Sequence, residues 1–195
     1  MNMRQSITGV ILAGGLGRRM GGQDKGLITL LGKPLYQHIA ERLEPQVEQL
    51  MINANRNQAR YQQSGFPVIS DLTEDFSGPL AGMQAALHAA KTEWLLFVPC
   101  DVPAFPLDLA VTFFENKGDS LACYANDTER DHPTFALIHR SLAPKLDEYL
   151  ARGERKLMFF MQEIAAKCVV FPSQLVAFTN LNTPEESLNW ELQQK

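Results

Sequence analysis

The segment from Gly14 to Gly26 combines residue types that bind phosphate. It holds six of the chain's thirteen glycines, and three cations, Arg18, Arg19 and Lys25, lie among them. A loop of glycines can turn its N–H groups inward toward phosphate oxygens, because no Cβ obstructs the approach. With one aspartate counted, the three cations leave this segment at +2, in a chain of net charge -4. A merely flexible loop would not explain these cations directly after the apolar run Ile7–Ala13, so we predict a phosphate-binding loop.

Two better-known phosphate loops do not fit this segment. A P-loop ends in Gly-Lys-Ser/Thr, whereas Lys25 follows an aspartate and precedes a glycine. The dinucleotide fingerprint fits at Gly15 and Gly17, but Met20 occupies its third glycine position. The next strand also ends in Asn53 and not in an acid for the ribose. The sequence therefore indicates neither an ordinary P-loop NTPase nor a classical dehydrogenase.

Asn53, Asp71 and Asp101 each follow a predicted strand. In an open parallel sheet, ligands bind outside the carboxyl ends of the strands, so we expect these side chains to lie beside the glycine loop. Each alone has a simpler explanation, since Asn and Asp are common turn residues. Together they would form a site with amide donors, cations and carboxylates.

Asp101 is the candidate metal ligand. It follows the apolar run Leu-Leu-Phe-Val and lies between two prolines that stiffen its turn. Magnesium prefers hard oxygen ligands and needs only one or two carboxylates besides substrate phosphates. We therefore predict Mg²⁺ on Asp101, and we expect Asp71 to accept hydrogen bonds from the nucleotide.

Alternating strand and helix patterns must position these residues. They predict an α/β fold, a Rossmann-like three-layer sandwich with a mainly parallel twisted sheet and the nucleotide at its carboxyl edge. We expect one domain over residues 1–195, with a nucleotide-binding N-terminal half and an acceptor-binding C-terminal half. The predicted strands are Ile7–Ala13, Gln49–Asn53, Pro67–Ser70, Trp94–Cys100, Ser120–Tyr124, Pro133–His139, Lys167–Phe171 and Phe178–Leu181. Helical stripes begin at Leu35, Leu80 and Leu142, and Thr183 caps a last helix.

Composition excludes several classes of protein. The chain has 195 residues, 45% of them apolar, which suffices for one buried core. A net charge of -4 argues against a nucleic-acid surface. The first apolar run is too short to span a bilayer and lacks a signal-peptide layout, so we expect no membrane contact and a cytoplasmic location. Cys100, Cys123 and Cys168 are too widely spaced to predict a disulfide framework or a zinc site.

Several motifs resemble those of known enzymes. The run Leu12-Ala-Gly-Gly-x-x-x-Arg-Met-Gly-x-x-Lys25 resembles the signature of the nucleotidyltransferase superfamily of the sugar-nucleotide pyrophosphorylase kind. Nearly end to end, the chain is similar to the family of molybdenum cofactor guanylyltransferases. The narrower resemblance is carried by Ser77-Gly-Pro-Leu-Ala-Gly82, Asp101-Val-Pro, Asp131-His-Pro-Thr134, Gly153-Glu-Arg-Lys156 and Asn180-Leu-Asn-Thr-Pro184.

The resemblance implies an activity and a set of site residues. Family members join GMP from GTP to the terminal phosphate of molybdopterin carrying molybdenum, and release pyrophosphate. The implied partners are GTP, a molybdopterin-type acceptor, and proteins that build or insert the molybdenum cofactor. Lys25 and Asp101 would be catalytic, with magnesium on Asp101. The implied GTP-binding residues are Leu12, Ala13, Gly14, Lys25, Asn53, Asp71 and Asp101, and we add Gly15 from the glycine loop.

This chemistry needs no general base. A phosphate monoester with a second pKa of about 6 is largely dianionic at neutral pH and can attack the α-phosphorus directly. Lys25 and magnesium would offset charge on the leaving pyrophosphate. We therefore interpret His38 and His88 as surface or packing residues. His132 differs only because its segment matches the family; its residues alone indicate an unremarkable strand start.

The acceptor site is predicted in the C-terminal half. Candidates are Arg19, Arg155, Asn180 and Asn182, because Asn suits the edge of a pterin and Arg suits its phosphate. Asn182 directly precedes a helix cap, so ordering the turn explains it equally well.

Three functions compete on these residues. The alternatives to a guanylyltransferase are a related enzyme that uses CTP or a sugar-phosphate acceptor, and a non-enzymatic nucleotide-binding regulator. The presence of both Lys25 and Asp101 argues against the regulator.

Overall fold

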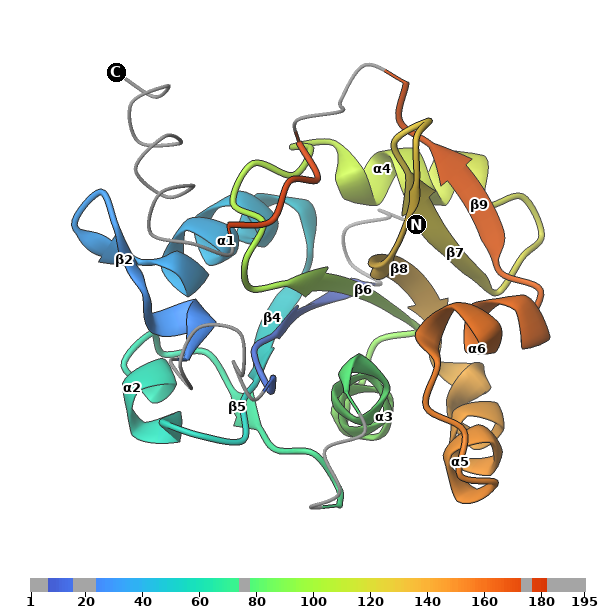
Figure 1. Ribbon diagram of the computed structural model, residues 1–195, viewed down its shortest axis with the longest axis horizontal. Helices are drawn as coiled ribbons and strands as arrows, with labels where there is room; N and C mark the ends of the chain where they lie inside the picture. The colour runs from blue at the N-terminus through green and yellow to red at the C-terminus, as the bar shows by residue number, and fades with distance from the viewer. Residues whose placement is uncertain (1–6, 16–23, 74–77, 173–176, 182–195) are drawn as a thin grey trace.

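The computed structural model describes residues 7–15, 24–73, 78–172 and 177–181. Seven strands form one sheet in the order β5-β4-β1-β6-β8-β7-β9 (Figure 1). Their bounds are β1 Ile7–Leu12, β4 Gln49–Asn53, β5 Val68–Ile69, β6 Trp94–Pro99, β7 Ala122–Asn126, β8 Asp131–His139 and β9 Lys167–Val170. A short hairpin of β2 (Thr29–Leu30) and β3 (Lys33–Pro34) forms a second sheet.

The sheet is parallel except at β8. Strand β1 pairs in parallel with β4 and β6, β4 with β5, and β7 with β9. Strand β8 lies antiparallel to both β6 and β7. Only four residues connect β7 to β8, which is far shorter than a parallel crossover requires. The prediction of a mainly parallel sheet is confirmed.

Helices cover both faces of the sheet. Figure 1 shows α1 and α4 above the sheet, with α3 and α5 below it. Their bounds are α1 Leu35–Leu43, α2 Gln58–Gln62, α3 Pro79–Ala89, α4 Leu109–Asn116, α5 Ala143–Ala151 and α6 Leu157–Glu163. The three layers predicted from sequence are therefore present.

Alternation along β1 feeds two separate cores. Ile7 and Ile11 pack with α1 and α4 on one face, whereas Val10 and Leu12 pack with α3 on the other. This follows from the period of two in a strand. Gly9 lies between Ile7 and Ile11 on the face toward α1, where a Cβ would come within 2.9 Å of Leu43. The resulting burial on both faces fixes the direction in which the end of β1 points.

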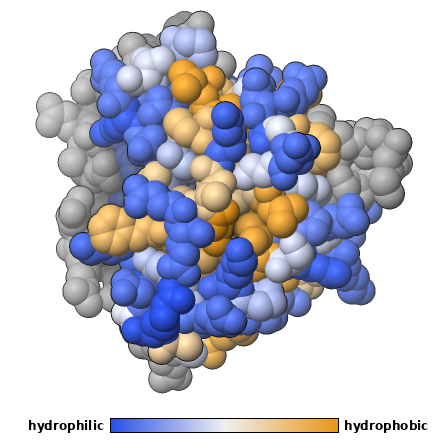
Figure 2. Space-filling view, turned by 90° about the vertical axis from the view of Figure 1, so that its right-hand side faces the viewer, coloured by the Kyte–Doolittle hydropathy of each residue, from blue (hydrophilic) through white to orange (hydrophobic). Residues whose placement is uncertain are grey.

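The outer edge at β9 is partly polar. Figure 2 shows apolar side chains interspersed among hydrophilic ones on the side of the molecule that carries α6 and β9. Val170 on β9 and Phe159 on α6 are exposed, and so is Lys167 at the start of β9. A lysine on an edge strand disfavours pairing with another chain.

One predicted strand is wrong, and several boundaries shift. Phe178–Leu181 forms no strand: the Leu181 N–H donates to the Asp101 carbonyl, 2.8 Å away, and Phe178 is buried among aromatic rings. The strand predicted at Ser120–Tyr124 begins and ends two residues later, and Pro67–Ser70 shortens to two residues. The helix predicted from Thr183 lies outside the described residues. Among the described residues, no helix is long and apolar enough to cross a membrane.

Candidate functional site

The carboxyl ends of β1, β4 and β6 open on one pocket of about 470 Å³. This volume lies within the range of small-molecule sites. Seven of the eight predicted nucleotide-binding residues line it: Leu12, Ala13, Gly14, Gly15, Lys25, Asn53 and Asp101. Gly78 and Pro79 at the start of α3 also line it, as do Cys100, Thr134 and Asn180. Segments that are far apart in the sequence therefore meet at the carboxyl edge of the sheet, as the predicted parallel strands led us to expect.

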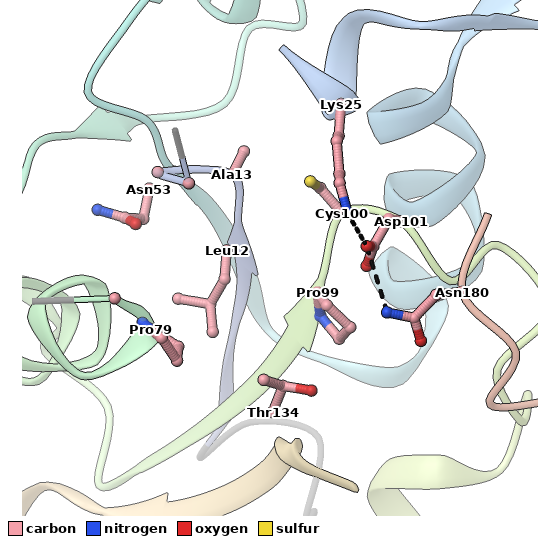
Figure 3. Close-up of a pocket in the computed structure, with 13 residues that line it drawn as sticks. Leu12, Ala13, Lys25, Asn53, Pro79, Pro99, Cys100, Asp101, Thr134 and Asn180 are labelled. Atoms are coloured by element: carbon pink, nitrogen blue, oxygen red, sulfur yellow. Dashed lines mark hydrogen bonds and ion pairs between the residues drawn. The ribbon is translucent and has the colours of Figure 1, made fainter. Parts of the chain in front are cut away.

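Two groups of polar side chains face each other across the pocket. Figure 3 shows Asn53 on one side and Lys25, Asp101 and Asn180 on the other, with Leu12 at the end of β1 and the following Ala13 between them. The space between the two groups is open to a ligand that could contact both. Such a ligand would present different chemistry at its two ends.

A cation, a carboxylate and an amide converge on the β6 side. Lys25 Nζ lies 2.9 Å from Asp101 Oδ2, and Asn180 Nδ2 donates to the same oxygen at 3.3 Å. Asp101 is 7% exposed, so its charge is largely removed from water and depends on these donors. The arrangement puts positive charge and a hard oxygen ligand at one place.

Backbone hydrogen bonds hold Asp101 at this point. The Cys100 N–H donates to the Leu12 carbonyl at 3.2 Å, which continues the β1–β6 pairing beyond the strand. The Asp101 carbonyl accepts from the Leu181 N–H at 2.8 Å. Asp101 is therefore fixed from both sides, by the end of β1 and by the C-terminal segment that carries Asn180.

Asn53 and Asp71 belong to a network on the opposite side. The Asp71 carboxylate accepts from Asn53 Nδ2 at 2.9 Å and from Asn55 Nδ2 at 2.8 Å. Asn55 also donates to the Gly14 carbonyl at 3.2 Å and accepts from the Asp71 N–H at 2.9 Å. Asp71 is not among the residues that line the pocket. In this structure it orients Asn53, which does line it.

Two glycines make room for Asn53. A Cβ at Gly82, in the second turn of α3, would overlap the Asn53 side-chain oxygen, and one at Gly14 would lie 2.8 Å from it. Asn53 is only 2% exposed. Glycine at both positions lets a buried amide approach the backbone closely, which explains two glycines of the sequence motifs by packing.

A carboxylate–histidine pair supports the C-terminal side of the pocket. His132 Nε2 lies 2.7 Å from Asp127 Oδ2, and the His132 ring stacks on Phe178 with centroids 5.0 Å apart. Burial alone would raise the pKa of Asp127, but hydrogen bonds from His132 and from the Arg130 and Glu129 N–H groups lower it to about 2. His132 lies at the start of β8, as its residues indicated. Beyond that expectation, its side chain contacts Asp127 and Phe178 and supports the segment leading to Asn180.

The structure describes two of the four predicted acceptor residues, Asn180 and Arg155, and does not bring these two together. Asn180 lines the pocket, whereas Arg155 is exposed and donates to the Leu150 and Glu154 carbonyls at 2.8 and 2.7 Å. Arg19 and Asn182 lie outside the described residues. His38 contacts the Leu30 carbonyl and His88 contacts Asp147, as expected for structural roles.

The cysteines match the prediction of unpaired thiols. All three are free, and Cys100 and Cys123 are buried. Burial first, and then the neighbouring Asp101 and Asp24 carboxylates, raise the pKa of Cys100. Cys100 lines the pocket as a neutral thiol.

Sequence reasoning missed Asn55, Asp127 and Thr134. Asn55 follows Asn53 by two residues, so a spacing of two after the strand was the available signal. Asp127 lies in the short β7–β8 turn, where an aspartate is ordinary, and its partner His132 could be found only through the hairpin. Thr134 enters the pocket because β8 runs antiparallel beside β6.

The fold and this site define a class of protein: an α/β nucleotidyltransferase. Residues 9–167 match the family described as the MobA-like NTP transferase domain. The molybdenum cofactor guanylyltransferase of Serratia proteamaculans (strain 568) is 60% identical over 97% of this chain and 96% of its own. That of Yersinia pseudotuberculosis serotype O:1b (strain IP 31758) is 57% identical over 97% of each chain. The chain belongs to the family of molybdenum cofactor guanylyltransferases, which confirms the resemblance and the class of enzyme.

Solved structures share the fold. The molybdopterin-guanine dinucleotide biosynthesis protein A of Archaeoglobus fulgidus superposes with a TM-score of 0.75 at 24% identity, over 95% of this chain and 97% of that one. A CMP:2-keto-3-deoxy-manno-octonic acid synthetase complexed with CTP superposes with a TM-score of 0.74 at 12% identity, over 97% and 98%. At these identities the likeness establishes the Rossmann-like architecture and nothing narrower.

Proposed function

We propose that the chain transfers GMP from GTP to the terminal phosphate of molybdopterin carrying molybdenum, and releases pyrophosphate. The observation that carries the proposal is the cluster of Lys25, Asp101 and Asn180 beside the glycine loop, in a chain 60% identical to a molybdenum cofactor guanylyltransferase. Because the reaction consumes GTP, we place it in the cytoplasm, where proteins that build or insert the cofactor would supply the acceptor and take up the product.

The nucleotide would span the pocket. Lys25 and the backbone of Gly14 and Gly15 would bind the phosphates, because they supply charge and N–H groups on one edge. Asn53 would contact the nucleoside from the opposite side, held by Asp71. Asp71 would thus act on the nucleotide through Asn53 in the arrangement seen here, or accept from it directly if the two amides shift.

Alignment and charge are what these residues would contribute to catalysis. The acceptor is a phosphate monoester that is largely dianionic at neutral pH, with a second pKa of about 6, so it attacks the α-phosphorus without a base. Pyrophosphate leaves on the side opposite the attack. Lys25 would stabilise the charge that develops on this leaving group.

Asp101 fits a divalent cation, and we assign it Mg²⁺. The described residues hold no cluster of three or more His, Cys, Asp or Glu side chains, so a metal such as zinc with an all-protein ligand set does not fit there. A single carboxylate beside phosphate-binding groups suits Mg²⁺, which completes its coordination with substrate phosphates and water. Bound there, the cation would neutralise phosphate charge, while Lys25 and Asn180 orient the carboxylate.

Division of labour between the two halves of the chain is part of the proposal. The glycine loop, Lys25 and Asn53 come from the N-terminal half. Thr134 and Asn180 enter the pocket from the C-terminal half, as would an acceptor. Arg155 does not line this pocket, and it remains a predicted acceptor ligand together with Arg19 and Asn182, which lie outside the described residues.

A nucleotide panel followed by turnover tests the proposal. The chain is heated with Mg²⁺ and GTP, CTP, ATP or UTP, and a ligand that binds only the folded state raises the midpoint of unfolding. We expect GTP to give the largest rise, and pyrophosphate release only when molybdopterin is added. A larger rise with CTP would favour the cytidylyltransferase alternative. Binding of GTP without turnover would favour a nucleotide-binding regulator.

A further inference from the structure

The end of the glycine loop is fastened by the side chain of Asp24. One carboxylate oxygen accepts from the Tyr61 hydroxyl, and the other accepts from Asn57 Nδ2 at 3.1 Å. The Asp24 carbonyl accepts from the Leu27 N–H at 3.0 Å and closes the turn Lys25–Leu27. Side chain and backbone thus fix the residue that directly precedes Lys25.

Tyr61 is a rigid point of attachment. It lies on α2 and is fully buried, and its ring contacts that of Tyr36 with centroids 5.0 Å apart. Its hydroxyl reaches beneath the loop, where a Cβ at Gly26 would overlap it. Glycine at position 26 is therefore explained by the approach of the Tyr61 hydroxyl.

The hydroxyl is held in its donating form. Burial first, and then the neighbouring Cys100 and Asp24, raise the pKa of Tyr61 far above its usual range. Tyr61 consequently keeps its proton and donates it to the Asp24 carboxylate. A hydrogen bond to a charged group is stronger than one between neutral groups.

The contacts lead from Tyr61 to the pocket. Asp24 is fixed by Tyr61, the next residue is Lys25, and Lys25 Nζ lies 2.9 Å from Asp101 Oδ2 in the pocket. We propose that Tyr61 is a positioning residue, which holds Lys25 toward the triphosphate through Asp24. This inference rests on the proposed role of Lys25 as a phosphate ligand.

The benefit of such an attachment is preorganisation. A lysine whose neighbouring backbone is not held in place loses backbone and side-chain conformational entropy when it binds phosphate. If Asp24 is already fixed, less of that loss falls on the binding step. Tyr61 touches neither substrate nor the reacting atoms in this account, so its effect must act through Lys25 alone.

Tyr61→Phe tests the inference with a matched control. The substitution removes one hydroxyl and keeps the buried ring. Tyr36→Phe removes a hydroxyl from the neighbouring buried ring, which accepts from the Gln37 amide and not from the loop. We expect Tyr61→Phe to weaken GTP binding by about tenfold, the scale of one hydrogen bond to a charged group, and Tyr36→Phe to leave GTP binding unchanged.

GMP separates positioning from general damage. GMP lacks the β- and γ-phosphates, which form the pyrophosphate assigned to Lys25. The Tyr61→Phe variant should therefore bind GMP with the same affinity as the unmodified chain. Equal loss of GTP and GMP affinity would overturn the inference, because a merely structural defect would affect both. Asp24→Ala removes the acceptor of the same hydrogen bond and should reproduce the result even if Tyr61→Phe folds poorly.

A double-mutant cycle distinguishes this inference from the proposed function. In a Lys25→Ala background, Tyr61→Phe should change GTP affinity by less than about twofold, because residues that act through one another are not additive. A full further loss would overturn the positioning role. If GTP does not bind the unmodified chain, the proposed function fails. If GTP binds and needs Lys25 but Tyr61→Phe has no effect, only the inference fails.

Discussion

Asp101 illustrates how little side-chain chemistry the proposed reaction needs. Its carboxylate accepts hydrogen bonds from Lys25 and Asn180, and it lies beyond the apolar strand β6. The strand is buried on both faces, so its folding does not depend on the carboxylate. Function and stability should therefore separate at this residue.

Asp101→Asn is the variant that exploits this separation. The amide keeps the size of the side chain but removes the charge that would hold the cation and attract Lys25. We expect GMP transfer to fall by at least about 100-fold, as when a group that stabilises transition-state charge is lost, with little change in the midpoint of unfolding. Pyrophosphate release and thermal unfolding are the measurements. Near-normal turnover in magnesium by the folded variant would reject Asp101 as the metal ligand.

Asp127 gives a stability that depends on pH. Its pKa is lowered from 3.8 to about 2 in the folded chain, so its contribution is present above about pH 4 and is lost as the pH falls toward 2. We expect Asp127→Asn to destabilise the fold by about 1.5–3 kcal/mol at pH 7, the range for hydrogen bonds to a charged group.

The same variant should match the unmodified chain near pH 2. Unfolding by denaturant at both pH values measures the difference. Asp108→Asn is the control, because Asp108 is exposed and its side chain makes no capping hydrogen bond at α4. A penalty for Asp127→Asn that persists at pH 2 would contradict the assigned origin of the pKa shift.

The site was predictable from sequence to different depths at different residues. Lys25, Asn53 and Asp101 could be placed together because each follows a strand whose carboxyl end had to reach one edge of the sheet. Two contacts could not be predicted in this way: the hydrogen bonds between Asn55 and Asp71, and the pair His132–Asp127. Both depend on side chains that meet across loops. Asn180 entered the candidates through family resemblance, and its contact with Asp101 required the fold.

At the scale of elements, helix α3 shapes the pocket because it has a glycine at a position where a side chain would collide with Asn53. Its first residue lines the pocket, and one turn later Gly82 lies against the buried Asn53 amide. Gly→Ala within a helix ordinarily stabilises by about 1 kcal/mol. Here the added methyl would instead overlap the Asn53 side chain and would also lie 3.1 Å from Leu12 Cδ2.

The Gly82→Ala substitution should therefore weaken nucleotide binding although it raises helix propensity. We expect the Asn53 amide to be displaced and GTP to bind about tenfold more weakly, the cost of one misplaced hydrogen bond to a ligand. Gln84→Ala on the same helix is the control, because Gln84 donates to Asp147 on α5, away from the pocket. Calorimetric titration with GTP measures both. Unchanged affinity in Gly82→Ala would show that the position of Asn53 does not matter to the nucleotide.

Element boundaries were the weaker part of the sequence prediction. Phe178–Leu181 has the aromatic and apolar character of a strand, yet its residues satisfy other partners: Phe178 stacks on His132 and Leu181 donates to Asp101. Residue type alone cannot separate a core strand from a buried irregular segment. The long strands β1, β4 and β6 were predictable because burial on both faces leaves a continuous apolar run.

At the scale of the whole molecule, the antiparallel strand β8 joins the two halves of the site. Strand β8 places Thr134 beside β6. Its pairing with β7 positions the turn whose Asp127 contacts His132. His132 in turn stacks on Phe178, close in sequence to Asn180. The N-terminal half alone would supply Lys25 and Asn53 without Thr134 and Asn180, which also line the pocket. The pocket therefore depends on the chain as one unit.

The last prediction separates the two substrates by position in the molecule. Arg155 lies outside the pocket lining and donates to backbone carbonyls near the end of α5, so we do not expect it to contact a nucleotide held at Lys25 and Asn53. If the acceptor extends from the pocket toward the C-terminal half, Arg155→Ala should weaken molybdopterin binding by about tenfold, the scale of a charge-assisted phosphate contact, and leave GTP binding unchanged. Asn180→Ala should impair turnover with both substrates bound, because Asn180 orients Asp101 itself.

A neighbouring arginine gives the matched control for that prediction. Arg152 is also exposed, but it pairs with Glu163 at 2.6 Å, so Arg152→Ala should alter the binding of neither substrate. Fluorescence titration with molybdopterin and calorimetry with GTP, run on all three variants, measure the two affinities separately. Direct attack requires the acceptor phosphate opposite the pyrophosphate. Because we assign Lys25 to the pyrophosphate side, we expect an acceptor ligand to come from elsewhere in the chain. If Arg155→Ala binds molybdopterin normally or loses GTP affinity in equal measure, that ligand is not Arg155.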